Sequence, residues 1–235
     1  MKYTPPFSIV IAAYNEEDYL EATLAAIRRQ TIPDYELIVV DNASRDKTAE
    51  IAKHYGAKVI REIKQGYVYA LNTGLKSATG DILVVTDADT ILPPHCLAEI
   101  QRAFKPGVVA LTGGLRYNTS SPIINNLVRH TYHAFIWLHF LIDKPHLTGS
   151  CMAIRREVFE KIGGLNTDLK VGADVGMGLA ARKYGRVVYV PRIAATASHR
   201  RWKSNGLTSM RRYIQAYINV VWRNKPTDHS LTPVR

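Results

Sequence analysis

The sequence predicts an α/β fold in which helices cover both faces of a mostly parallel, doubly wound sheet. Two observations support this prediction. Short apolar runs, each long enough for one buried strand, recur along the first half of the chain, and segments with the apolar spacing of a helix separate them. Strands that alternate with helices in this way pair in parallel, because each helix returns the chain to the starting edge of the sheet.

The first half of the chain carries this alternation. Its expected strands are 7–13, 37–40, 59–60, 82–86 and 108–111. Its expected helices are the segment in which Leu20, Leu24 and Ile27 recur at helical spacing, followed by 48–55, 67–77 and 93–104. Gly56 ends the second helix and Pro93 opens the fourth, since glycine follows helix ends and proline suits the first helical turn.

The alternation ends near Gly114, and the second half has a different character. The segment 122–142 combines aromatic, aliphatic and histidine residues, and we expect a helix packed over the sheet edge. His130, His133 and His139 do not share one helical face, so a structural role or a wall of an acceptor site is favoured over a metal site. The remaining expected elements are a strand at 150–154, helices at 157–162 and 174–184, and a strand at 187–190 that ends at Pro191.

The C-terminal segment is strongly basic, with Asp228 as its single acidic residue. Its basic residues include Arg200, Arg201, Lys203, Arg211, Arg212, Arg223 and Lys225. Apolar residues fall on one face of an expected helix: Met210, Tyr213, Ile214, Tyr217 and Val221. A basic amphipathic helix can lie in an anionic membrane interface, but it can also dock its apolar face on the domain, and both interpretations stay open.

Composition bounds the class of protein. With 235 residues, 46% of them hydrophobic, the chain can bury the core of one large domain. A formal net charge of +11 favours an anionic partner, such as nucleotide phosphates, a lipid phosphate, an acidic membrane surface or nucleic acid. Only Cys96 and Cys151 are present, so neither a disulfide framework nor a structural zinc site is expected. A reduced, cytoplasmic setting fits best, and we expect neither a signal peptide nor a membrane span.

Two carboxylates follow the apolar run 82–86, which is typical of a strand covered on both faces. A turn at Ala88 can bring Asp87 and Asp89 to one centre at the end of that strand. Carboxylate oxygens at this spacing suit Mg²⁺ or Mn²⁺ that also carries phosphate oxygens. A solvated turn is the alternative, because aspartate is common where strands end.

Polar residues also follow two other strands of the predicted sheet. Tyr14 and Glu16 come after the first strand, and Asp41 ends the second. The carboxyl ends of neighbouring parallel strands form the crevice in which such sheets bind ligands. Neither GxGxxG nor GxxxxGK[ST] follows the first strand, which counts against a dinucleotide oxidoreductase and a P-loop NTPase. A divalent cation would then neutralise phosphates in place of a glycine-rich loop.

Several short motifs in register resemble those of family 2 glycosyltransferases with the GT-A fold. The motifs are SIVIAAYNEE at 8–17, VVDNASRDKT at 39–48, the DxD-like 87–89, and the segments 70–81, 149–155, 163–164 and 172–174. The likeness covers roughly residues 7–202 and implies a Rossmann-like, mostly parallel sheet. It implies a nucleotide-sugar-binding half at 1–114 and a smaller acceptor-binding half of the same domain at 115–199. The basic tail described above then occupies 200–235.

The resemblance also implies roles for the residues at the strand ends. Ala13, Tyr14 and Glu16 would flank the base and ribose of a nucleotide, and Asp41 would hydrogen-bond one of them. Asp87 would face the ribose or the metal, and Asp89 would bind Mn²⁺ or Mg²⁺ that bridges the diphosphate.

Asp174 aligns with the aspartate of the family's Glu-Asp pair, the general base that deprotonates the acceptor. Ala173 stands where glutamate is usual. Asp174 also has a structural interpretation, because an aspartate that precedes a helix is a favoured N-cap. A carboxylate can serve both purposes at a helix N-terminus, where its ionised form is stabilised.

A last group of implied site residues follows the final expected strand. His199 stands where many relatives carry a histidine that completes metal coordination, Arg200 and Arg201 would meet the diphosphate, and Trp202 would cover the donor. The segment 198–202 only partly resembles the QxxRW motif of processive members, because Ser198 replaces glutamine. Polysaccharide synthesis is therefore not expected.

The resemblance implies an inverting, metal-dependent transfer of a sugar from a UDP- or GDP-linked donor to a hydroxyl or phosphate acceptor. Charge and amphipathicity favour a lipid phosphate, a glycolipid or a glycan as the acceptor, with peripheral contact at the inner face of the cell membrane. The alternatives are a protein that binds nucleotide sugars without catalysis, a sugar nucleotidyltransferase and a nucleic-acid-binding protein. No nucleic-acid partner is expected, because the paired aspartates would repel a phosphate backbone.

Overall fold

The computed structural model describes residues 5–117, 121–169, 171–198, 215 and 217–223. The strands are β1 Phe7–Ala13, β2 Glu36–Asp41, β3 Lys58–Arg61, β4 Ile82–Val85, β5 Thr90–Ile91, β6 Val108–Tyr117, β7 Met152–Arg155 and β8 Arg186–Ala197. The helices are α1 Leu20–Arg28, α2 Thr48–His54, α3 Tyr67–Ser77, α4 Cys96–Ala103, α5 Pro122–Leu141, α6 Arg156–Lys161 and α7 Ala173–Ala181, with a short π-helical turn at Asn219–Arg223.

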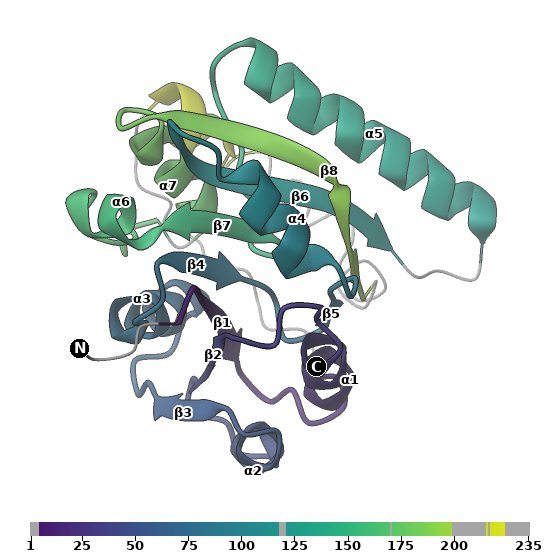
Figure 1. The fold of residues 1–235 in the computed structure, drawn as a ribbon, viewed down its shortest axis with the longest axis vertical. Helices are drawn as coiled ribbons and strands as arrows, with labels where there is room; N and C mark the ends of the chain where they lie inside the picture. The colour runs from purple at the N-terminus through teal and green to yellow at the C-terminus, as the bar shows by residue number, and fades with distance from the viewer. Residues whose placement is uncertain (1–4, 118–120, 170, 199–214, 216, 224–235) are drawn as a thin grey trace.

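The strands form one curled sheet in the order β3-β2-β1-β4-β7-β6-β8-β5 (Figure 1). β3, β2, β1 and β4 are parallel to one another, and β6 is parallel to β8. β7 runs antiparallel between β4 and β6, and the short β5 runs antiparallel to β8. The predicted α/β class with a mostly parallel sheet is confirmed.

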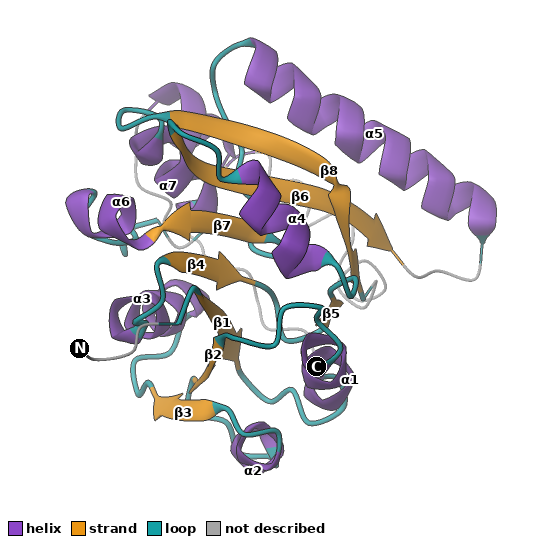
Figure 2. Cartoon of the chain, in the orientation of Figure 1, coloured by secondary structure: helices purple, strands orange, loops and turns teal. Residues whose placement is uncertain are grey.

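Helices cover both faces of the sheet (Figure 2), and alternate strand residues supply the two cores. Val10, Val40 and Leu83 pack with α3, α6 and α7 on one face. Ile9 and Val39 pack with α1, α2 and α4 on the other. Because successive strand side chains point to opposite faces, a strand buried on both sides must be apolar at nearly every position, as the runs in the sequence are.

Three differences from the predicted elements lie in the second half of the sheet. β8 does not end at Pro191 but continues to Ala197, and β6 extends to Tyr117. The β6–β8 register shifts between Gly113 and Gly114, and Pro191 sits in the irregular stretch opposite, where a residue without an N–H group costs no ladder hydrogen bond. β5 was not predicted, because a strand of two residues has no periodicity to detect.

The long helix α5 packs on β6 and β8, as expected for the helix predicted over the sheet edge. Its buried residues are Ile136 and His139, whereas Ile123, Leu127 and Leu141 are exposed. Among the described residues, no helix combines the length and the apolar character needed to cross a membrane.

Part of the basic tail docks on the domain. Val220 and Val221 are buried, and the Tyr217 ring stacks on His146 with centroids 5.6 Å apart. Tyr217 also meets His139 of α5 edge to face at 5.1 Å. The described portion of the tail therefore supports the docking interpretation of its apolar face. Met210, Tyr213 and Ile214 lie outside the described residues.

Gly74 provides a test of the helix-to-sheet packing that positions the candidate site. A methyl group on Gly74 would stand 2.5 Å from Val10 Cγ1 and 2.8 Å from Val40 Cγ2, so α3 could not keep its place on β1 and β2. We predict that Gly74→Ala lowers the free energy of unfolding by about 1–2 kcal/mol, because overpacking outweighs the gain in helix propensity. Urea unfolding followed by circular dichroism measures this change.

The matched control is Lys76→Ala, an exposed position on the same helix, which should change stability by less than about 0.5 kcal/mol. A Gly74→Ala variant as stable as the wild type would show that α3 and the sheet are not in this close contact.

Candidate functional site

The loops after β1 and β2 are bound to each other by hydrogen bonds in both directions. The Asn15 N–H donates to Ser44 Oγ at 3.0 Å, and the Arg45 N–H donates back to Asn15 Oδ1 at 2.9 Å. The Glu16 N–H donates to Thr48 Oγ1 at 2.8 Å. Because these bonds fix one loop against the other, the structure brings the predicted site residues of both loops to one edge of the sheet.

Asp41 lies at the carboxyl end of β2, in register with Ala13 of β1. It is only 7% exposed, and its Oδ1 accepts a hydrogen bond from the Ser44 N–H at 3.0 Å. The Asn42 N–H donates to the Ala13 carbonyl at 2.8 Å. The carboxylate is therefore held in one orientation beside the end of β1, where Tyr14 follows.

Asn42 has a larger role than its position after a strand suggested. Its Nδ2 donates to the carbonyls of Glu62 and Lys64, each at 2.9 Å, and its Oδ1 accepts from the Gly66 N–H at 2.8 Å. One buried amide thus fixes the loop that leads into α3 and so places Tyr67, the first residue of that helix. Tyr67 was not predicted as a site residue, because only the fold brings its hydroxyl beside Gly149, which is far away in the sequence.

The turn after β4 places Asp87 and Asp89 at the same edge. The Thr90 N–H donates to the Asp87 carbonyl at 3.3 Å, which closes the turn predicted at Ala88. Asp89 Oδ2 accepts from Ser198 Oγ at 2.8 Å, and the Ser198 N–H donates to the Asp89 carbonyl at 3.2 Å. The end of β8 is therefore attached directly to the second aspartate.

Gly149 connects Asp87 with Asp174. The Gly149 N–H donates to Asp174 Oδ2 at 3.1 Å, and a Cβ atom on Gly149 would stand 3.6 Å from Asp87 Oδ1 and 2.5 Å from the Tyr67 hydroxyl. Two carboxylates from opposite halves of the chain thus flank one glycine. Any side chain at position 149 would displace Tyr67, which explains why this position needs glycine.

Asp174 is not the N-cap of its helix. α7 begins at Ala173, the cap position is Gly172, and Asp174 lies in the first turn. The N-cap interpretation was wrong because Gly172 adopts a left-handed backbone conformation, with φ of 82°, that starts the helix earlier. Ala173 is buried in the core, so the usual glutamate of the family would have to point its charge into apolar surroundings there.

Burial raises the pKa of Asp174 above the ordinary range of an aspartate, although hydrogen bonds from the Val175 and Gly149 N–H groups act in the opposite direction. Each of those bonds favours the ionised form, which accepts them best. Asp174 as a whole residue is half-buried, but its carboxylate group is enclosed by protein. A raised pKa makes Asp174 a stronger proton acceptor than an exposed aspartate.

The described residues contain no group of three or more His, Cys, Asp or Glu side chains that could hold a metal on its own. Asp87 and Asp89 nonetheless offer the hard oxygen donors that Mn²⁺ and Mg²⁺ prefer. This donor set fits an ion whose remaining ligands come from a diphosphate or from water. His199, Arg200, Arg201 and Trp202, the other predicted site residues, lie outside the described residues.

Comparison with known proteins identifies the family of this chain. The sequence pattern described as Glycosyl transferase family 2 matches residues 8–163, which include both loops, the Asp pair and Gly149. The chain belongs to glycosyltransferase family 2.

Two curated relatives match most of the chain. Glycosyltransferase AglE of Haloferax volcanii is 34% identical over 197 residues, which cover 74% of this chain and 61% of that protein. The dolichol-phosphate mannosyltransferase of Pyrococcus furiosus is 31% identical over 197 residues, covering 78% and 55%. The chain thus spans little more than half the length of these relatives.

Solved structures show the same fold. The mannosyltransferase PcManGT from Pyrobaculum calidifontis, solved with GDP-Man and Mn²⁺, superposes with a TM-score of 0.73 at 23% identity, covering 96% of this chain and 66% of that one. Glucosyl-3-phosphoglycerate synthase from Mycobacterium tuberculosis, solved with Mn²⁺ and UDP, gives a TM-score of 0.63 at 22% identity, covering 92% and 80%. The predicted GT-A fold is confirmed.

The environment of Asp174 yields a prediction about pH. If Asp174 accepts the proton of the acceptor, then kcat/KM falls as the pH drops through its pKa, and this limb lies above the ordinary range of an aspartate because burial raises that pKa. We predict that Asp174→Asn lowers sugar transfer roughly 100-fold or more and removes this limb. Initial rates measured from acid to neutral pH test both statements.

Protein stability separates this role from a structural one. Because the pKa of Asp174 is raised in the folded protein, ionisation of this carboxylate destabilises the fold as the pH rises through that pKa. Asp174→Asn should therefore be at least as stable as the wild type at neutral pH. Asp168→Asn, an exposed position, is the charge-matched control and should leave transfer unchanged. An Asp174→Asn variant that keeps full activity would remove Asp174 as the base.

Proposed function

We propose that the chain transfers a sugar from a UDP- or GDP-linked donor to an acceptor hydroxyl or phosphate, with a divalent cation and with inversion at the anomeric carbon. One observation carries this proposal. In a member of glycosyltransferase family 2, Asp41 at the end of β2 and the Asp87–Asp89 pair after β4 share one sheet edge, and Gly149 lies between Asp87 and Asp174 of the second half.

The donor would lie over the ends of β1, β2 and β4. Ala13, Tyr14 and Glu16 would border the base and ribose, and Asp41 would accept a hydrogen bond from one of them. Asp87 and Asp89 would hold Mn²⁺ or Mg²⁺, which when bound neutralises charge on the diphosphate. The names of relatives solved with GDP-Man and Mn²⁺ or with UDP and Mn²⁺ support this class of donor.

Asp174 would act on the acceptor. An acceptor oxygen attacks the anomeric carbon from the side opposite the diphosphate, the bond from that carbon to the diphosphate oxygen breaks, and the diphosphate leaves with the electron pair. Asp174 takes the proton of an acceptor hydroxyl, or orients the attacking oxygen of a phosphate. A single displacement of this kind inverts the configuration. The Gly149 and Val175 N–H groups keep the carboxylate in position.

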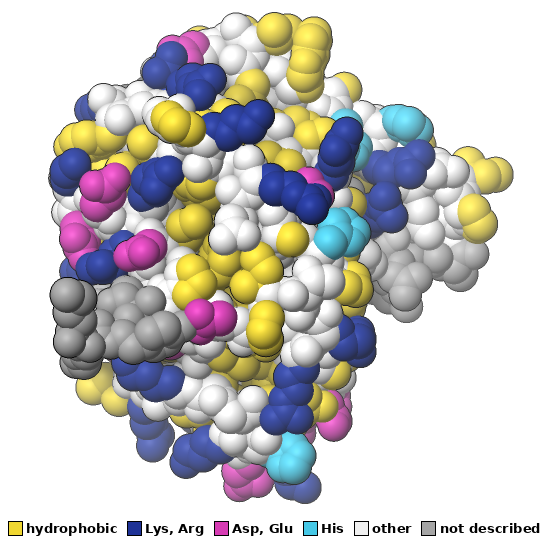
Figure 3. All heavy atoms as spheres, in the orientation of Figure 1, with side chains coloured by type: hydrophobic (Ala, Val, Ile, Leu, Met, Phe, Trp, Pro, Cys, Tyr) yellow, Lys and Arg dark blue, Asp and Glu magenta, His cyan; other side chains and the backbone are white. Residues whose placement is uncertain are grey.

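The acceptor is proposed to be lipid-linked and presented at a membrane surface, with the chain peripheral on the inner face. A net charge of +11 favours contact with anionic lipids. The outer side of α5 exposes apolar residues, with Ile123 80%, Leu127 62% and Leu141 58% exposed. Figure 3 shows hydrophobic side chains at the surface over both ends of this helix. The name of the Pyrococcus furiosus relative, a dolichol-phosphate mannosyltransferase, supports the same class of acceptor.

A thermal-shift panel of UDP, GDP and CDP, each with and without Mn²⁺, tests the donor site. We predict that one nucleotide raises the melting temperature by roughly 5–10 °C at about 100 times its Kd, and only with Mn²⁺, because the two carboxylates need phosphate oxygens to complete the coordination. Mn²⁺ alone should give little shift.

Two variants at opposite ends of β4 make this test specific. Asp89→Asn should abolish the metal-dependent shift, whereas Asp81→Asn, exposed at the other end of the strand, should preserve it. No response to any nucleotide, or an unchanged response of Asp89→Asn, would overturn the proposed donor site. Release of free nucleoside diphosphate with an acceptor present then separates an enzyme from a protein that only binds the donor.

A further inference from the structure

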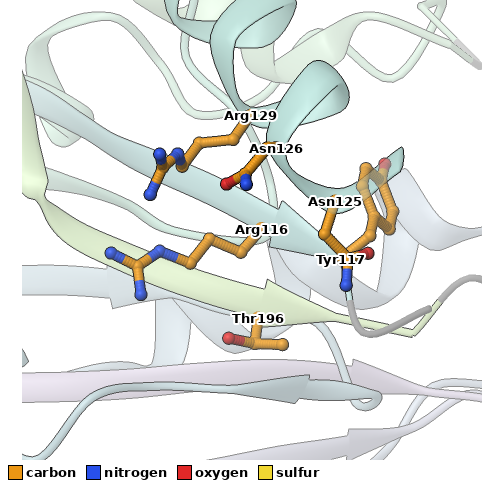
Figure 4. A pocket seen from close by; sticks show the side chains of 6 residues that line it. All are labelled: Arg116, Tyr117, Asn125, Asn126, Arg129 and Thr196. Atoms are coloured by element: carbon orange, nitrogen blue, oxygen red, sulfur yellow. The ribbon is translucent and has the colours of Figure 1, made fainter. Parts of the chain in front are cut away.

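A polar pocket of about 240 Å³ opens between α5, β6 and the end of β8. Its lining residues are Arg116, Tyr117, Asn125, Asn126, Arg129 and Thr196. In Figure 4 the side chains of Arg116 and Arg129 extend in the same direction, one from β6 and the other from α5, and Asn126 lies between them. Two guanidinium groups therefore border one small space.

The positive charge of this pocket has no acidic counterpart in the described part of the chain. The ion pairs found there involve other basic residues, and neither Arg116 nor Arg129 belongs to one. Arg129 Nη2 lies 3.4 Å from His130 Nε2, so this guanidinium contacts a second basic side chain. Burial and the charges of Arg129, His130 and Arg116 together lower the pKa of His133. An anion bound here would compensate this charge.

A second hollow, of about 680 Å³, lies farther along α5, between that helix and β8, and is mainly apolar. Its lining includes His133, Trp137 and Phe140 of α5, and Val188, Tyr189 and Pro191 of β8. Arg129, His133 and Trp137 follow one another at intervals of four residues, so they form one stripe along the helix. We call these two hollows together the α5–β8 groove, which is cationic beside Arg129 and apolar beside Trp137.

The cationic end lies beside the candidate donor site. Thr196 lines the pocket and pairs with Ile91 of β5, and two residues further along the chain Ser198 donates its hydroxyl to Asp89. Two strand residues span about 7 Å, so Thr196 in the pocket lies about the length of one sugar from Ser198, the residue that bonds Asp89.

We propose that the α5–β8 groove binds the acceptor as a single-chain lipid monophosphate, with the phosphate between Arg116 and Arg129 and the hydrocarbon chain along Trp137, Phe140 and Tyr189. Guanidinium groups bind phosphate oxygens through paired, charge-assisted hydrogen bonds, and two of them match a phosphate monoester dianion. Along α5, the eleven steps from Arg129 to Phe140 span about 16 Å, enough for a short prenyl chain. The inference rests on the proposed function for the role of this ligand as acceptor.

The groove differs from the outer side of α5, and adjacent residues separate the two surfaces. Trp137 lines the groove, whereas Leu138 does not, although both are similarly exposed at 60% and 53%. A bilayer that contacts the outer side of the helix would depend on Leu138 at least as much as on Trp137. A lipid in the groove depends on Trp137.

Calorimetric titration of the full chain tests the groove with three probes: farnesyl phosphate below its micellar concentration, inorganic phosphate and farnesol. We expect farnesyl phosphate to bind at least ten-fold more tightly than either fragment, because only it fills both ends of the groove. Arg116→Gln with Arg129→Gln should weaken it ten-fold or more, and Trp137→Ala should weaken it about ten-fold. Trp137→Ala should leave the affinity for inorganic phosphate unchanged.

The controls are Leu138→Ala and Arg102→Gln, an exposed arginine of α4 on the other face of the sheet, and both should bind like the wild type. Two results would overturn the proposed lipid site. One is that farnesyl phosphate binds no more tightly than inorganic phosphate, and the other is that Leu138→Ala lowers the affinity for farnesyl phosphate as much as Trp137→Ala does. The Mn²⁺-dependent nucleotide shift, measured on the same samples, distinguishes the two proposals. If that shift persists while farnesyl phosphate fails to bind, only the groove is wrong, and if both fail, the proposed function is wrong as well.

Discussion

The pairing of β7 with β4 holds the two halves of the molecule in one sheet, and the candidate site depends on it. β7 runs antiparallel to β4, so it begins at the edge where β4 ends. Thr86 Oγ1 reinforces the junction by donating to the Ser150 carbonyl at 3.0 Å. The residue before Ser150 is Gly149, whose backbone reaches Asp174 and whose missing side chain leaves room for Tyr67. Without this pairing, Asp87 and Asp174 would belong to separate parts of the chain.

Backbone N–H groups orient two of the carboxylates at this edge. Ser44, Gly149 and Val175 use their N–H groups to orient the carboxylates of Asp41 and Asp174. Such donors stabilise negative charge without adding a competing positive side chain, so the carboxylates stay able to bind a cation or a proton. Positive charge gathers instead in the neighbouring pocket between α5 and β6, at Arg116 and Arg129. This separation suits a reaction between an anionic donor and an anionic acceptor, because each would have its own site.

How much the sequence predicts depends on the range of the contacts. β1 to β4 and α3 were predicted closely, because strands buried on both faces are apolar throughout and their helices carry their own stop signals. The prediction that β8 ends at Pro191 was wrong. Pro191 lies at an irregularity in the pairing with β6, and the strand continues beyond it. The strand-end aspartates were predictable as a group. The roles of Asn42, Tyr67 and Arg116 were not, because each depends on residues far away in the sequence.

A crystal of the chain grown with Mn²⁺ and the nucleoside diphosphate that it binds would test the central claim most directly, since anomalous scattering locates manganese without assumptions about its ligands. The account predicts a manganese peak within about 2.5 Å of a carboxylate oxygen of Asp89 or Asp87. It also predicts the nucleotide over the ends of β1 and β2, beside Tyr14 and Asp41. A manganese peak away from this edge, or a nucleotide bound elsewhere on the fold, would contradict it.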